Sequence, residues 1–236
     1  MCVRTVATER NSRPAMSAPF AELGEGATVG DNGGMARHRA AAPFRLLYVC
    51  TGNICRSPFA EIITRHVLIG RLGGREASAF QVSSAGVRAV VGSGMHPDSR
   101  AELAPWNLDT TAAEQFTARQ LRSAMVAECD LVLGATPRHR SAVVERLPAA
   151  LPITFSLREF ARLAEAVDPD ALPEAPTERA QALVELARAQ RGLVPPPEDG
   201  DDVPDPIGGP QSAHHAAANL IREAVQRIVT VMLPSR

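Results

Sequence analysis

The chain lacks most of the features that would place it in a membrane, on a nucleic acid or in an oxidising compartment. It has no apolar run of about 18 residues, the length that a membrane-spanning helix needs. Its four cysteines follow no regular spacing, which argues against a disulfide framework and favours a reducing compartment. The formal net charge is −1 without a basic stripe, which argues against a nucleic-acid surface. The arginines near the N-terminus precede no apolar segment of the kind that a secretion signal contains. We therefore predict a cytoplasmic protein that binds neither nucleic acid nor membrane, with its oligomeric state left open.

The order of the predicted elements indicates one α/β domain. Residues 1–43 show no periodicity and are expected to form a disordered tail, whereas residues 44–236 form the folded domain. Apolar runs and helical spacing predict strands over 45–50, 80–84, 130–133 and 152–155, and helices over 57–70, 97–104, 117–127, 137–147 and 220–233. Strands that alternate with helices form a parallel sheet.

The most informative stretch, CTGNICRSP, runs from Cys50 to Pro58 between a predicted strand and a predicted helix. Pro58 fits the first helical turn, because the N–H group that proline lacks would be unpaired there. Free N–H groups and the positive end of the helix dipole favour a bound anion at such an N-terminus. Arg56 lies six positions after Cys50, so a phosphate could bind between the two side chains. The stretch is interpreted as a phosphate-binding loop with a cysteine nucleophile.

The residue types in this loop fit phosphoryl chemistry. Only about 3% of an ordinary thiol is ionised at neutral pH, and the loop N–H groups, the helix dipole, Ser57 and Arg56 could stabilise the Cys50 thiolate. Arg56 can also hold two phosphoryl oxygens in a bidentate fork. Gly52 permits a positive φ, and Asn53 tolerates one and could brace the loop with its amide. The predicted phosphate-binding residues are Thr51, Gly52, Asn53, Ile54, Cys55, Arg56 and Ser57.

The pair Cys50 and Cys55 could instead indicate a metal site. Structural zinc needs about four ligands in a tetrahedral arrangement. Cys2 and Cys129 are isolated, and no histidine pattern lies beside the pair. We therefore expect no metal and no other cofactor.

The stretch from Val49 to Pro58 resembles the phosphatase loop of the low-molecular-weight protein tyrosine phosphatases, and the chain is identified as a divergent bacterial member of that family. The resemblance covers about residues 45–160 and 201–233. It implies a three-layer α/β sandwich with a four-stranded parallel sheet, of the flavodoxin-like phosphotyrosine phosphatase I type. It also implies a phosphomonoester hydrolase that forms a phosphocysteine on Cys50. The substrate would be a phosphorylated protein or a small phosphomonoester.

The departing oxygen of a phosphate ester must be protonated, so a general acid is required. Members of this family carry an Asp-Pro pair shortly before the last helix, and Asp205-Pro206 falls at that place. The resemblance thus assigns the acid role to Asp205, with Asp202 as the nearest rival. From the residues alone, the acidic stretch 198–205 would be a solvated turn.

Further matches and departures concern the surroundings of the loop. Ser84 falls where a family serine hydrogen-bonds the loop asparagine, so Ser84 joins Asn53 and Ser57 as a supporting residue. Phe116 stands where many members have a histidine in the loop network. Members that act on phosphotyrosine have aromatic residues after Asp-Pro and on the loop at 85–92, and both are missing here. Ile54, by contrast, is the residue of the tyrosine-directed branch, since relatives that hydrolyse phosphoarginine have threonine there.

Two functional alternatives and two structural questions remain open. An arsenate reductase has the same fold but needs a relay of cysteines, and Cys129 has no nearby partner. A phosphate-binding module with little turnover would fit the missing aromatics, although Cys50, Arg56 and Asp205 are all present. The resemblance allows Cys55 to form a reversible disulfide with Cys50, whereas a small buried side chain is an equal interpretation. Residues 157–199, with predicted helices over 157–167 and 177–191, are expected to form an exposed helical insertion without a catalytic role, the alternative being a lid or a partner surface.

Overall fold

The fold is built on a sheet of four parallel strands in the order β2-β1-β3-β4. The computed structural model describes residues 42–233, so nearly all of the predicted tail lies outside the described residues. The strands are β1 (Phe44–Cys50), β2 (Phe80–Gly86), β3 (Leu131–Gly134) and β4 (Thr154–Ser156). Each strand overlaps its predicted range, and the expected parallel sheet is confirmed.

The central strand β1 explains why the sheet is covered on both faces. Leu46 pairs in register with Val82 of β2 and Leu131 of β3, so β1 has a neighbour on each edge. Its side chains alternate between two cores: Tyr48 belongs to the larger cluster, and Leu47 to the smaller one. A strand that is apolar on both faces is typical of a parallel sheet between two helical layers. Burying a leucine such as Leu47 fully contributes about 2 kcal/mol.

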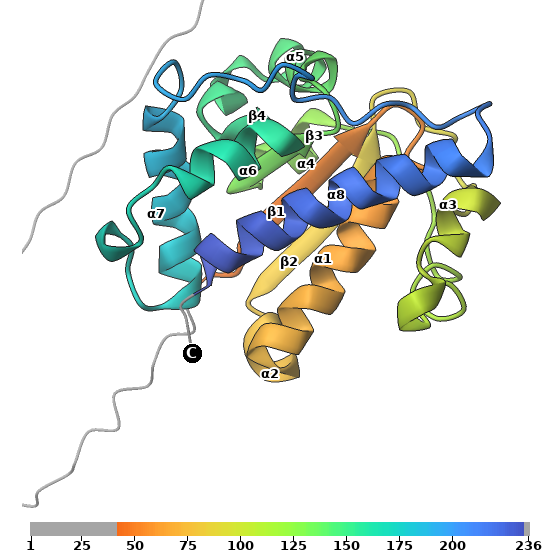
Figure 1. The fold of residues 1–236 in the computed structure, drawn as a ribbon, viewed down its shortest axis with the longest axis horizontal. Helices are drawn as coiled ribbons and strands as arrows, with labels where there is room; N and C mark the ends of the chain where they lie inside the picture. Colours follow the sequence, from red (N-terminus) through yellow and green to blue (C-terminus); the bar gives the residue numbers. More distant parts are fainter. Residues whose placement is uncertain (1–41, 234–236) are drawn as a thin grey trace, which may run out of the picture. The chain divides into compact units, whose positions relative to one another are not determined.

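Helices form the two outer layers, as Figure 1 shows. One face is covered by α1 (Arg56–Leu72), α6 (Leu157–Glu165), α7 (Pro176–Ala189) and α8 (Gln211–Met232), and the other by α4 (Ser123–Ala127) and α5 (Pro137–Arg146). In the view of Figure 1, α8 crosses in front of the sheet beside α1. The remaining helical pieces are α2 (Gly74–Ala77), α3 (Pro97–Ala101) and the 3₁₀ turns Ala104–Trp106, Pro148–Ile153 and Pro169–Ala171. The three-layer α/β arrangement is therefore as predicted.

Two predicted helices have the wrong bounds. Residues 117–122 are not helical, because Gln120 forms a parallel bridge with Gly86 and Leu121 N donates to the Gly86 carbonyl (2.8 Å). Only α4 remains of the helix predicted over 117–127. The last helix begins at Gln211 rather than at residue 220. Its first turns bury alanines such as Ala217, which a search for large apolar residues does not detect.

The segment 157–199 is packed, not peripheral. Phe160 and Leu163 of α6 and Leu183 of α7 are almost completely buried in the larger core. The expectation of an exposed excursion is therefore wrong, because both helices carry an apolar face that contributes to the same core as α8. That this segment is an insertion relative to the family stays a prediction.

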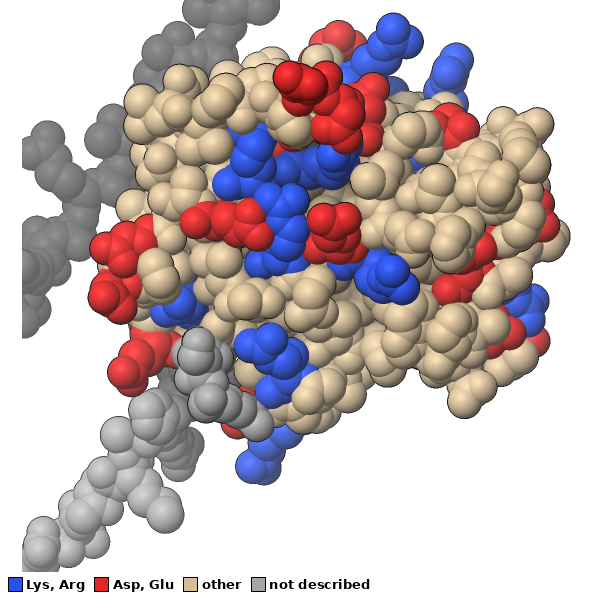
Figure 2. All heavy atoms as spheres, in the orientation of Figure 1, with Lys and Arg blue, Asp and Glu red and all other residues tan. Residues whose placement is uncertain are grey.

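The surface charges are mixed. On the face seen in Figure 2, arginine side chains lie among acidic ones. The ion pairs of the described residues include Arg158 with Asp199, Arg162 with Asp201, and Arg227 with Glu165. Within residues 42–233, no helix combines the length and apolar character that crossing a membrane requires.

Candidate active site

The loop after β1 is held from outside by its carbonyl groups. The carbonyl oxygens of Cys50, Thr51, Gly52 and Ile54 accept hydrogen bonds of 2.8–3.0 Å from the backbone N–H groups of Val87, Arg88, Val90 and His96. In a trans peptide the N–H of the next residue points opposite to the carbonyl. The N–H groups of the loop residues that follow these carbonyls therefore point to its inner side.

The inner side of the loop is an anion site with a sulfur at its base. Asn53 N donates to Cys50 Sγ (3.3 Å), which shows the inward direction directly. Helix α1 begins at Arg56 without a side-chain cap, so its first N–H groups add to the same positive end. The hydroxyl of Ser57 lies 3.0 Å from Cys50 Sγ. A thiolate at this position would accept hydrogen bonds from both the loop and Ser57.

Asn53 braces the loop. Its Nδ2 donates to Ser57 Oγ (2.9 Å) and to Ser84 Oγ (2.8 Å), and its Oδ1 accepts from Arg119 N (2.9 Å). The hydrogen bond to Ser84 that the resemblance implied is present. The backbone of Asn53 has a positive φ of 55°, whereas Gly52, at which a positive φ was expected, does not. Asparagine is among the few side chains that tolerate this conformation.

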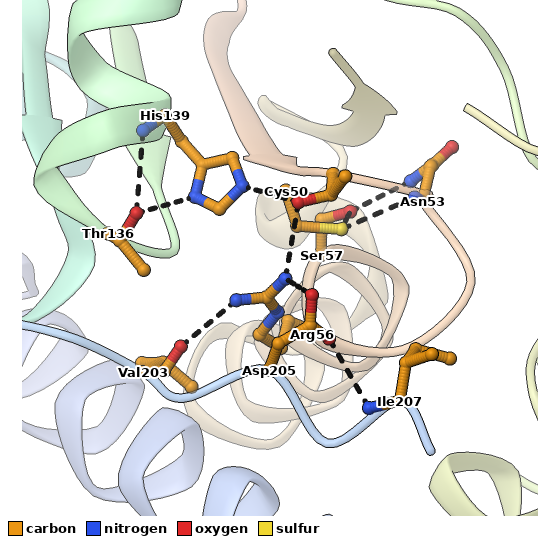
Figure 3. A network of polar contacts seen from close by, with 10 residues as sticks. Cys50, Asn53, Arg56, Ser57, Thr136, His139, Val203, Asp205 and Ile207 are labelled. Atoms are coloured by element: carbon orange, nitrogen blue, oxygen red, sulfur yellow. Dashed lines mark hydrogen bonds and ion pairs between the residues drawn. The ribbon is translucent and has the colours of Figure 1, made fainter. Parts of the chain in front are cut away.

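Arg56 extends from the start of α1 across the mouth of the loop and is buried (Figure 3). Its Nη1 donates to the Val203 carbonyl (3.1 Å), and its Nη2 lies 2.6 Å from Asp205 Oδ2 and 3.4 Å from Thr51 Oγ1. Nε is buried and has no hydrogen-bond partner among the described residues. The Nε–Nη2 edge of the guanidinium can therefore hold two oxygens of an anion once the Asp205 carboxylate moves away.

The structure brings Asp205, and not Asp202, to the loop. Asp205 pairs with Arg56, and its side chain is 47% exposed. Asp202 is exposed, and its backbone carbonyl accepts from Arg158 (3.2 Å). The neighbouring Asp201 pairs with Arg162 (2.8 Å). Helix α6 therefore binds the acidic segment that precedes Asp205, while Asp205 lines the same cavity as Cys50.

The sequence analysis did not identify His139. This histidine, in the first turn of α5, contacts Thr51 Oγ1 through Nε2 (3.0 Å) and Thr136 Oγ1 through Nδ1 (2.9 Å). Thr136 is also the N-cap of α5, so the chain of contacts runs from a helix terminus to the phosphate-binding loop. Burial, with the nearby positive charge of Arg56, lowers the pKa of His139 to about 4. The ring is therefore neutral at neutral pH and positions Thr51 without adding charge.

The depressed pKa of His139 makes stability depend on pH. The unfolded chain binds a proton here below about pH 6.5, whereas the folded chain binds it only near pH 4. The free energy of unfolding therefore falls as the pH falls from 6.5 to 4. Over this range we expect the free energy of unfolding of His139→Gln to fall by about 2 kcal/mol less than that of the wild type. Urea unfolding at several pH values measures this difference. Parallel plots of unfolding free energy against pH for the two proteins would contradict the prediction.

One cavity of about 220 Å³ contains the predicted catalytic set. Its lining residues are Cys50, Thr51, Gly52, Ile54, Cys55, Arg56, Arg88, Val90, Asp205 and Ile207. None of these is aromatic. Trp106 lies beside His66, with 6.3 Å between the ring centroids, and Phe116 packs against the larger core.

The cysteines of the described residues are all free. Cys55 is buried, and burial raises its thiol pKa to about 11. Cys129 packs in the smaller core on the other face of the sheet, donates to the Met125 carbonyl and has its pKa raised to about 12 by burial. A redox role of Cys55 stays a prediction.

Comparison with known proteins agrees with this geometry. The family model described as low molecular weight phosphotyrosine protein phosphatase matches residues 45–190. The chain is 27% identical over 186 residues to a protein-arginine-phosphatase of Geobacillus stearothermophilus, covering 79% of this chain and 94% of that protein. It is 30% identical over 182 residues to a low-molecular-weight protein-tyrosine-phosphatase of Streptomyces coelicolor, covering 77% of this chain and 88% of that protein. A solved structure of the YwlE arginine phosphatase from Geobacillus stearothermophilus gives a TM-score of 0.56 at 28% identity, covering 80% and 92%.

A cysteine at the base of a phosphate-binding loop, at the end of a central parallel strand, defines a cysteine-based phosphatase. The chain belongs to the low molecular weight phosphotyrosine protein phosphatase family. The family match ends at residue 190, before Asp205. The role of Asp205 is therefore argued from its position beside Arg56.

Proposed function

We propose that the protein hydrolyses phosphorylated side chains of proteins, or small phosphomonoesters, through a phosphocysteine on Cys50. The observation that carries the proposal is the convergence of Cys50, Arg56 and Asp205 on one cavity. The loop N–H groups and the Nε–Nη2 edge of Arg56, once Asp205 has moved off Nη2, would hold the phosphoryl oxygens. Hydrogen bonds from Asn53 N and Ser57 Oγ would stabilise the sulfur as a thiolate.

The reaction would proceed in two displacements. In the first, the Cys50 thiolate attacks phosphorus, an S–P bond forms, and the ester P–O bond breaks while protonated Asp205 gives its proton to the departing oxygen. In the second, the Asp205 carboxylate takes a proton from water, which attacks phosphorus. The S–P bond then breaks and releases inorganic phosphate and the Cys50 thiolate. Atoms and charge balance in each displacement, and neither displacement requires a metal, an oxidant or a reductant.

The side chains that line the cavity influence which substrate it favours. Ile54, Val90 and Ile207 are aliphatic, and they can contact an aryl ring but cannot hydrogen-bond a guanidinium group. We therefore propose phosphotyrosine rather than phosphoarginine as the better substrate, although the Geobacillus relative is named an arginine phosphatase. Because no ring stacks on the substrate, we expect only a weak preference among aryl phosphates.

An added aromatic wall should strengthen that preference. Val90 lines the cavity and is 48% exposed, so Val90→Tyr can place a ring beside the substrate without disturbing the core. An aromatic pair contributes about 0.5–1.5 kcal/mol, so KM for a phosphotyrosine peptide should fall about two- to tenfold with kcat unchanged. Val91→Tyr is the matched control, because Val91 is exposed but does not line the cavity. Equal effects of the two variants would contradict this account of the wall.

The proposal is tested by hydrolysis of a small aryl phosphate between about pH 5 and 8, with a chelator present. Rapid acid quenching followed by peptide mapping should find the phosphoryl group on Cys50. Phosphotyrosine and phosphoarginine peptides are then compared. Phosphate binding without hydrolysis would point to a binding module, and thiol-dependent reduction of arsenate would point to a reductase. No observation favours that reductase, since Cys129 lies across the sheet from Cys50.

The cytoplasmic location also belongs to the proposal. It is supported by the three free cysteines of the described residues, which fit a reducing compartment. Labelling of these thiols in intact cells by a membrane-permeant reagent, but not by an impermeant one, would agree with it.

A further inference from the structure

A cluster of metal-binding side chains lies behind the phosphate-binding loop. The ligand atoms of Cys55, His96 and His214 all lie within 4.8 Å of one another. Cys55 comes from the loop, His96 precedes α3 and His214 belongs to the first turn of α8. None of the three has a role in the proposed displacements beyond the place of Cys55 in the loop. The cluster brings a thiol and two imidazoles together from distant parts of the chain.

His214 points a ligand atom into this cluster. Its side chain is completely buried, and its Nδ1 lies 2.8 Å from Ser99 Oγ. Its Nε2 is buried and has no hydrogen-bond partner among residues 42–233. A buried polar atom without a partner costs about 1–3 kcal/mol, so its retention calls for an explanation. If Ser99 accepts the proton of Nδ1, the lone pair of the neutral ring lies on Nε2, which is the state that binds a metal.

The two imidazoles of the cluster lie against each other. The rings of His96 and His214 are stacked, with centroids 4.7 Å apart, and two protonated rings would repel each other there.

A carboxylate lies at the edge of this cluster, outside the three ligand atoms that approach one another within 4.8 Å. Asp98 Oδ2 lies 3.8 Å from His214 Nε2 and 3.9 Å from His96 Nδ1. If the Asp98 side chain turns inward to complete the set, one thiolate, two imidazoles and one carboxylate balance the charge of a divalent ion. Zinc takes four ligands of these types, at about 2.3 Å to sulfur and about 2.0–2.1 Å to nitrogen. Neighbouring ligand atoms would then be about 3.3–3.8 Å apart, so the cluster needs to contract by about 1 Å. His96 and Asp98, whose side chains are 32% and 45% exposed, can make the movements that bring them to the ion.

We propose that Cys55, His96, Asp98 and His214 form a zinc site that is separate from the hydrolytic chemistry. Binding replaces the proton of the Cys55 thiol with a sulfur–zinc bond and releases that proton to solvent. The bound sulfur would no longer be available to react with Cys50. The sequence analysis expected no metal, because it weighed only the spacing of the cysteines. The two histidines reach Cys55 only through the fold.

The test uses the full chain with Cys2→Ser and Cys129→Ser as background, which leaves Cys50 and Cys55 as the only thiols. Cobalt(II), a spectroscopic substitute for zinc, should bind with one equivalent. It should give a thiolate-to-cobalt charge-transfer band that added zinc removes. Cys55→Ser should abolish the band, while Cys50→Ser should retain it. His214→Gln should weaken the affinity at least about tenfold.

Two further variants make the test decisive. His215→Gln is the matched control, because His215 neighbours His214 on α8 but is 62% exposed and pairs with Glu102; it should bind as the background protein does. His96→Gln alters a partly exposed side chain, so a loss of affinity there does not depend on the folding of the His214 variant. Circular dichroism reports the folding of each variant. The proposal is overturned by the absence of stoichiometric binding, by binding that survives both His96→Gln and His214→Gln, or by a charge-transfer band that needs Cys50.

Discussion

Cys50→Ser is expected to reduce the hydrolysis of an aryl phosphate at least about a thousandfold. The serine hydroxyl is not ionised at neutral pH, so the hydrogen bonds from Asn53 N and Ser57 Oγ have no anion to stabilise. The loop itself should survive, because its carbonyl bonds and the Asn53 network do not involve the sulfur. Loss of turnover with retained phosphate binding is therefore the expected result.

The measurement combines initial rates with phosphate binding by calorimetry. Cys129→Ser is the matched control, since it removes a thiol on the far face of the sheet and should leave the rate unchanged. Residual activity of Cys50→Ser close to that of the wild type would remove Cys50 from the reaction.

Asp205→Asn should have an effect that depends on the leaving group. General acid catalysis contributes about 10²–10⁴ in rate. We expect a loss in this range for an alkyl or phenyl phosphate, whose departing oxygen needs a proton. The loss should be small for p-nitrophenyl phosphate, whose phenolate is a stable anion. The KM should fall, because the carboxylate no longer competes with phosphate for Arg56 Nη2.

The matched control for Asp205 is Asp202→Asn. Asp202 is exposed and contributes only its backbone carbonyl, to Arg158, so its replacement should change kcat by less than about twofold. A loss at Asp205 that is equal for good and poor leaving groups would show that Asp205 is not the proton donor. A larger effect at Asp202 would transfer the role to its side chain.

The parts of the site that the sequence predicts are local. Cys50, Asn53, Arg56 and Ser57 belong to one strand–loop–helix unit, and their relative positions follow from that unit. The parallel sheet is also predicted, because each apolar run is short and is followed by a helical segment. The position of Asp205 came only from the family resemblance, since an acidic turn rich in proline has no periodicity of its own.

The remaining parts of the site depend on contacts between distant segments. His139 has an ordinary position in the sequence, and only the adjacency of β1 and β3 brings it to Thr51. Arg56 is held by the backbone carbonyl of Val203, and a pattern of side chains in the sequence does not reveal such a backbone contact. Residues 117–122 looked helical, but the backbone at Gln120 pairs with Gly86 at the end of β2. Tertiary contact prevailed over local preference in that segment.

The attachment of the Asp205 segment has a consequence for the kinetics of turnover. Both backbone polar groups of Val203 are bound, since its N–H donates to the Ala135 carbonyl (2.9 Å) and its carbonyl accepts from Arg56. After Asp205, Gly209 N donates to the Pro206 carbonyl, and the chain enters α8. Separation of the Arg56–Asp205 pair therefore requires rotation of one half-exposed side chain rather than movement of a lid. Such rotations take picoseconds to nanoseconds, whereas lids take microseconds to milliseconds. We therefore expect the site to open without a slow gating step.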